Sequence, residues 1–153
     1  MKLFQIEEPD GSPRESDEPG IAVGIELSAE KGAAVAVAIG GNAELLPGAD
    51  GERRIAAGKL EDKEAMRALL LRLRERAEKA LARPVTHAVV ALGATSEAVR
   101  HAVAAAAPEA GLTLLRVVAA KEAAARAVGA AAADAALLGA AIQAEDDAAP
   151  LAR

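Results

Sequence analysis

Residues 21–46, IAVGIELSAEKGAAVAVAIGGNAELL, decide the first half of the fold. They contain three short apolar runs, at 21–25, 33–39 and 43–46, separated by a polar turn and a Gly-Gly-Asn turn. Runs of this length bounded by such turns predict antiparallel strands joined as hairpins. A loop that holds a phosphate between two strands needs glycine and hydroxyl groups. The first turn reads SAEK, so it has the layout of such a loop without most of its residues.

The rest of the chain alternates helical and strand patterns. Asp62 and Ser96 are expected N-caps, because each precedes apolar residues at the three- and four-residue spacing of a buried helix face. The nearly continuous apolar run at 85–92 predicts a strand buried on both faces. The predicted later elements are helices at 62–82, 96–108, 122–128 and 134–144, the last capped by Asp134, and strands at 85–92 and 112–118, with a strand fragment near Arg54 and Ile55.

This order, β-β-β-α-β-α-β-α-α, predicts an α/β fold with a mixed sheet, a single ribonuclease-H-like lobe. We expect the lobe to span residues 21–144. Residues 1–20 combine prolines, glycines and many charges, a composition typical of a disordered leader. Residues 145–153 are expected to form a disordered tail.

Alanine dominates the composition. By count, 43 of the 153 residues are alanine and 24 of these follow residue 100, while Phe4 is the only aromatic residue among Phe, Tyr and Trp. Alanine favours helix but buries little area, so the core must rest on Leu, Val and Ile. We therefore expect a thinly packed fold of modest stability.

Charge and cysteine content narrow the classes of partner. The net charge of −5 argues against nucleic acid and against an anionic membrane surface. The absence of cysteine excludes disulfides and thiolate metal sites. The most apolar stretch, 127–144, is rich in Ala and Gly and carries Asp134, which is not typical of a membrane span. With no signal-peptide pattern at the N-terminus, a cytoplasmic location is expected.

Four stretches in order resemble one family. They are VGIELSAEKG at 23–32, GGNAELLPGADGERR at 40–54, the longer segment 83–129, and LLGAAIQAED at 137–146. Together they resemble part of the actin-like ATPase domain, its first lobe, of DnaK-type (70-kDa heat-shock) chaperones. LFQIEEP at 3–9 is similar to the leader of the HscA-type branch, which serves iron–sulfur-cluster assembly.

The resemblance also implies two internal gaps. Only a few residues separate Ile55 from Glu61, where the family inserts a small subdomain. Only a few separate Gly129 from Asp134, where the family has its second lobe with the second phosphate loop. Both gaps fall between predicted elements, so the remaining chain is expected to close one core.

Within the first phosphate loop the resemblance assigns each position. Glu26 stands where the family has Asp, and Ser28 stands where it has Gly. Ala29 and Glu30 replace two threonines, and Lys31 replaces an Asn. A carboxylate at position 30 would repel a bound phosphate, because like charges about 4 Å apart repel by about 1 kcal/mol in water and by more near a protein surface. We interpret these five residues as a vestigial phosphate loop.

The resemblance implies that the family's catalytic Glu position is occupied by Ala120, while Glu122 lies two residues further on. Phosphoryl transfer depends on positioning and on electrostatic stabilisation, so these losses predict no ATPase, no catalytic residues and no cofactor. The favoured function is a non-catalytic, chaperone-derived module that acts as a protein-interaction or regulatory partner in a DnaK- or HscA-type system. Self-association into a homo-oligomer is a further expectation.

Two alternatives stay open. The chain could be a minimal protein that binds or hydrolyses Mg-ATP as an oligomer, with a second copy replacing the missing lobe. It could also be a decayed or designed sequence that has a fold and no activity.

The carboxylates Glu26 and Glu30 and the two histidines are the candidate metal ligands in the sequence. Glu26 and Glu30 could form a carboxylate pair, but strand-end and turn charges that face solvent are the favoured interpretation. His87 and His101 lack a second His or a Cys at ligand spacing, so structural or exposed roles are favoured. The sequence therefore predicts no metal site.

Overall fold

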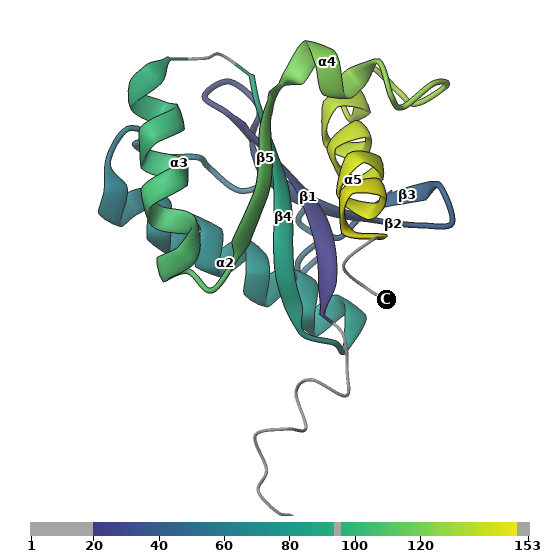
Figure 1. Cartoon of the computed structure of the whole chain (residues 1–153), viewed down its shortest axis with the longest axis horizontal. Helices are drawn as coiled ribbons and strands as arrows, with labels where there is room; N and C mark the ends of the chain where they lie inside the picture. The colour runs from purple at the N-terminus through teal and green to yellow at the C-terminus, as the bar shows by residue number, and fades with distance from the viewer. Residues whose placement is uncertain (1–19, 94–95, 150–153) are drawn as a thin grey trace, which may run out of the picture.

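A computed structural model describes residues 20–93 and 96–149 of the chain. Its centre is a mixed sheet with strand order β3-β2-β1-β4-β5. The first three strands pair antiparallel, and β4 and β5 run parallel to β1 (Figure 1). The strands are β1 (Ile21–Ser28), β2 (Gly32–Ile39), β3 (Asn42–Leu45), β4 (Val85–Leu92) and β5 (Thr113–Ala119).

Helices cover both faces of the sheet. Helices α2 and α3 lie on one face, and α4 and α5 lie on the other (Figure 1). The helices are α2 (Lys63–Leu81), α3 (Glu97–Glu109), α4 (Ala120–Ala124) and α5 (Ala135–Ala148). The order and pairing confirm the predicted ribonuclease-H-like α/β lobe, including the strand fragment, which is an isolated bridge between Ala33 and Ile55.

The two last helices differ from the prediction. Helix α4 is only five residues long and ends at Ala124, because the Ala- and Gly-rich segment after it forms turns around Gly129, whose φ is +86°. Helix α5 runs on to Ala148, so the expected start of a disordered tail at 145 was wrong. The Glu145 carboxylate accepts hydrogen bonds from the N–H groups of Gly40 and Gly41, at 2.6 and 2.9 Å, which holds this end of the helix on the β2–β3 turn. Residues 1–19 of the predicted leader, which spans 1–20, and residues 150–153 lie outside the described residues.

The core differs between the two faces of the sheet. Towards α2 and α3 it consists of large aliphatic side chains, as the composition predicted. Towards α5 the sheet presents mainly alanine, because residues 33–38 read AAVAVA and alternate residues of a strand point to opposite faces. The large buried side chains on the first face include Val23, Ile25, Leu27, Val35, Met66, Leu70 and Leu73.

The small side chains let α5 lie directly against the main chain of the sheet. A Cβ atom added to Gly24 of β1 would stand 2.2 Å from the main-chain N of Ala141 in α5. On the other side of the helix, a Cβ atom on Gly139 would collide with the main-chain carbonyl of Ala123 in α4. Two glycines therefore set the distance of α5 from the sheet and from α4.

Side chains also tie α5 to the edge strand β5. The Arg116 guanidinium donates hydrogen bonds to both carboxylate oxygens of Asp147, at 2.8 and 3.1 Å, and Gln143 donates another at 2.8 Å. Partial burial raises the pKa of the Asp147 carboxyl, but the hydrogen bonds from Arg116 and Gln143 outweigh it and leave that pKa below its ordinary value. At neutral pH this pair is therefore fully charged.

The predicted N-caps of α2 and α3 are both present. The Asp62 carboxylate accepts a hydrogen bond from the N–H of Ala65 at 2.8 Å, and the Ser96 hydroxyl accepts one from Val99 at 3.2 Å. These contacts satisfy N–H groups that have no partner within the helix. Ser96 is thus accounted for as a structural residue.

Candidate functional site

A buried carboxylate marks the carboxyl end of β1. Glu26 is 1% exposed, although it lies two residues from the end of the strand. Its neighbours Ile25 and Leu27 point into the core beneath α2 and α3, so the Glu26 side chain points to the opposite face, where α5 begins. The expectation that Glu26 faces solvent was wrong, because a cation is available to it inside the fold.

That cation is Arg54. Its Nη2 atom lies 3.0 Å from Glu26 Oε1. The same Nη2 donates hydrogen bonds to the carbonyl oxygen of Ala133 at 2.9 Å and to Asp134 Oδ1 at 3.2 Å. One guanidinium nitrogen therefore has three oxygen atoms around it, one from β1 and two from consecutive residues of the turn before α5.

The bridge between Ala33 and Ile55 explains how Arg54 reaches this place. The two residues exchange main-chain hydrogen bonds of 2.7 and 2.9 Å, which fix the segment in an extended form beside β2. The Ile55 side chain enters the core under α2, so the preceding Arg54 points to the other face. The doublet Arg53-Arg54 is thereby placed beside the turn that precedes α5.

Two further cations border this group. Lys31 Nζ lies 3.8 Å from Glu26 Oε2, and its side chain is 42% exposed. Arg53 Nη2 lies 2.7 Å from Asp134 Oδ2, and its side chain is 61% exposed. We call these five residues, Glu26, Lys31, Arg53, Arg54 and Asp134, the charge cluster.

The Asp134 side chain has a different role from the one predicted. Asp134 is the N-cap residue of α5 as predicted, but its side chain makes no capping hydrogen bond to the helix. The carboxylate instead accepts from Arg53 and Arg54. Hydrogen bonds to charged groups contribute more than those to a neutral main-chain N–H, which is why the two guanidinium groups hold this carboxylate.

The other three residues of the predicted phosphate loop, Ser28, Ala29 and Glu30, lie outside the charge cluster. The Ser28 hydroxyl accepts a hydrogen bond from the N–H of Lys31 at 3.0 Å and closes the turn between β1 and β2. Ala29 and Glu30 are exposed at its tip. Glu30 takes no part in the charge cluster, so the structure does not pair it with Glu26 as a metal site.

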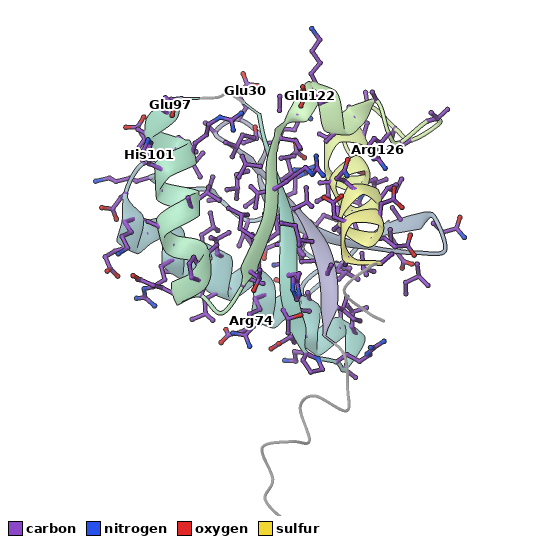
Figure 2. All side chains as sticks on the ribbon, in the orientation of Figure 1. Glu30, Arg74, Glu97, His101, Glu122 and Arg126 are labelled. Atoms are coloured by element: carbon purple, nitrogen blue, oxygen red, sulfur yellow. The ribbon has the colours of Figure 1, made fainter. Side chains whose placement is uncertain are left out.

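Ala120 is the first residue of α4, directly after β5, and it offers only a methyl group. Glu122 is exposed on α4, and Figure 2 shows it with Glu30 at the same end of the molecule, both on the outside. Neither carboxylate belongs to the charge cluster. The position that the resemblance assigns to the catalytic Glu thus carries no group that could orient water.

Each histidine has a polar neighbour on its own strand or helix. The His87 ring nitrogen Nδ1 lies 2.7 Å from the Thr86 hydroxyl within β4. His101 lies 3.6 Å from Glu97 on the exposed surface of α3 (Figure 2). Within residues 20–93 and 96–149, no group of three or more His, Cys, Asp or Glu side chains is arranged to hold a metal ion.

A separate pocket borders the turn between β1 and β2 at Ala29. It has a volume of about 690 Å³. Glu26 and Arg54 do not line it, so the pocket is distinct from the charge cluster. Its lining residues are Ala29, Gly58, Lys59, Leu60, Glu61, Asp62, Ser96 and Val99.

A mixed sheet of order β3-β2-β1-β4-β5 with helices on both faces is consistent with part of an actin-like, ribonuclease-H-like ATPase lobe. The model of the Hsp70 protein family matches residues 50–138, more than half of the 153 residues. The chain therefore belongs to the Hsp70 family, and it is a chaperone-derived module. A search of the curated proteins gave no match. None of the helices in the described part of the chain is long and apolar enough to cross a membrane.

Proposed function

We propose that this chain is a non-catalytic member of the Hsp70 family, with a degenerate nucleotide site. The observation that supports this is the position of Arg54, whose guanidinium lies 3.0 Å from the buried Glu26 carboxylate. Glu26 corresponds by resemblance to the family's Asp near the metal-bound phosphates. In this chain the Glu26 carboxylate is already paired with a cationic side chain of the protein, that of Arg54.

The other loop residues support the same proposal. Ala29 has no hydroxyl for a phosphate, and Glu30 places a negative charge at the tip of the turn. Ala120 has no carboxylate to orient an attacking water. Because phosphoryl transfer relies on positioning and charge stabilisation, the loss of these groups together removes the basis for ATP hydrolysis.

Calorimetric titration with Mg-ATP and Mg-ADP tests the loss of nucleotide binding. We expect no binding tighter than about 100 µM, which corresponds to roughly 5.5 kcal/mol. A DnaK-type chaperone with both lobes, titrated in the same buffer, serves as the positive control. Tighter binding by this chain would overturn the non-catalytic proposal and favour the minimal ATP-binding alternative.

We further propose that the module acts by binding proteins of a DnaK- or HscA-type chaperone system in the cytoplasm. The support is a lobe that keeps its sheet, its helices and a closed core while its nucleotide residues are replaced. The similarity of residues 3–9 to the HscA leader favours the branch that serves iron–sulfur-cluster assembly.

Affinity capture with the folded chain tests this partner role. We expect enrichment of the resident DnaK- or HscA-type chaperone, its J-domain cochaperone or the iron–sulfur scaffold protein over capture with an unrelated acidic domain of equal size. Enrichment of the scaffold would support the HscA branch. If none of the three is enriched, the partner proposal is wrong.

A further inference from the structure

Arg54 Nη2 lies in a small set of oxygen atoms, which we call the oxygen cage. The cage consists of Glu26 Oε1 at 3.0 Å, the Ala133 carbonyl oxygen at 2.9 Å and Asp134 Oδ1 at 3.2 Å. Two carboxylate oxygens and one main-chain carbonyl are the donor types that hard divalent cations such as Ca²⁺ and Mg²⁺ prefer. The cage thus has the chemistry of a cation site, with a guanidinium nitrogen at its centre.

The contact of this guanidinium with Glu26 is electrostatic, whereas its contacts with Ala133 and Asp134 are hydrogen bonds. Glu26 Oε1 and Arg54 Nη1 are both buried, and neither has a hydrogen-bond partner among the described residues. A guanidinium and a carboxylate that match each other usually form two parallel hydrogen bonds. Here Nη2 meets Glu26 by charge and proximity, as a metal ion in a set of oxygen ligands does.

The neighbouring cations do not occupy the cage. Arg53 contacts only the second oxygen of Asp134, at 2.7 Å, from the exposed side. Lys31 Nζ lies 3.8 Å from the second oxygen of Glu26 and 3.4 Å from the Ala133 carbonyl, at the rim. The side chain of Arg54 is 18% exposed, and its Nη2 atom contacts all three oxygens of the cage.

We propose that Arg54 is a built-in cation that occupies the oxygen cage and keeps divalent metal ions out of it. The Hsp70 family implies a magnesium nucleotide beside Glu26, and the residues present do not fit it, because the guanidinium already takes the place of the cation. The positive charge also joins the end of β1 to the turn before α5. Both carboxylates at this point then have cationic partners from the protein itself, without metal.

This inference rests on the proposed function, and metal alone tests it without any nucleotide. Its failure is therefore distinguishable from the failure of the nucleotide titration. The experiment compares the melting temperature in EDTA with that in about 5 mM Ca²⁺ or Mg²⁺, since a ligand that binds the folded state raises the melting temperature. The proteins are the unmodified chain, Glu26→Gln, Arg54→Ala, the control Arg53→Ala, and Arg54→Ala combined with Glu26→Gln.

We expect the unmodified chain and Arg53→Ala to shift by less than about 1 °C, because Arg54 remains in the cage. Arg54→Ala vacates the cage and leaves two carboxylates, so its melting temperature is expected to rise by about 5 °C with metal. The added Glu26→Gln change removes one of these charges and is expected to abolish the rise. If Arg54→Ala is unfolded in EDTA, folding on addition of metal supports the proposal.

Three results would overturn it. The first is a metal-dependent rise in the unmodified chain that Glu26→Gln removes. The second is an Arg54→Ala variant, folded or unfolded in EDTA, that does not respond to either metal. The third is a response of Arg54→Ala that persists when Glu26 is also changed to Gln, since the ion would then bind elsewhere.

Discussion

Gly24→Ala is expected to lower the free energy of unfolding by about 3 kcal/mol, the upper end of the range for overpacked cores. The added Cβ atom would stand 2.2 Å from the N of Ala141 and 2.6 Å from the C of Ala140. Both are main-chain atoms of α5, so no side-chain rotation relieves the contact. Either the helix moves away from the sheet or β1 bends, and each response opens the alanine-lined face of the core.

Urea unfolding followed by circular dichroism measures this loss, and amide hydrogen exchange in α5 locates it. Gly41→Ala is the matched control, because it adds the same methyl group where no atom lies within 4 Å. Its expected loss is about 1 kcal/mol, from the left-handed backbone at that residue, where φ is +84°. Equal losses in the two variants, with unchanged exchange in α5, would show that the helix does not rest on β1 at Gly24.

Arg54→Met is expected to destabilise the chain by about 3 kcal/mol in metal-free buffer, because it leaves the buried Glu26 carboxylate without its nearest cation. Lys31 is the remaining cation beside Glu26 in the described residues, at 3.8 Å and largely in solvent, so it compensates little. Combining Glu26→Met with Arg54→Met removes both charges. The double variant is expected to be within about 1 kcal/mol of the unmodified chain, since apolar replacements of buried ion pairs are often neutral.

Chemical unfolding of the two single variants and the double variant gives the coupling energy directly. Arg53→Met is the control, because Arg53 shares the partner Asp134 but is 61% exposed, and exposed ion pairs contribute less than about 1 kcal/mol. If Arg54→Met costs no more than Arg53→Met, the buried pair does not stabilise this fold.

The sequence correctly predicted those elements that are specified by residues close to one another in the chain. Strand β4 has the predicted bounds of 85–92, because a continuous apolar run specifies a strand buried on both faces. The caps Asp62 and Ser96 were predicted correctly, since each depends on residues within the next turn. The extension of α5 past Ala144 depends on the contact of Glu145 with the turn at Gly40, 105 positions away, and no local pattern records it.

The candidate site was predicted only in part, for the same reason. The position of the loop and the identity of Glu26 were visible in the sequence, but the burial of Glu26 depends on Arg54. The placement of the Arg54 side chain in turn depends on Asp134, 80 positions further along the chain. In the sequence, Asp134 indicated only a helix cap. One usable signal was the Arg-Arg doublet next to an apolar strand fragment, because alternate residues of an extended segment face opposite sides.

The alanine side of the sheet restricts how this sequence can change over time. Opposite α5, a larger side chain at Ala34, Ala36 or Ala38 would meet a helix that already lies against the strand main chain. Opposite α2 and α3, one aliphatic side chain can replace another of similar volume at small cost. Substitutions are therefore expected to accumulate on one side of the molecule only. Homologues of this chain can be sorted by whether their residues at these three positions have remained small.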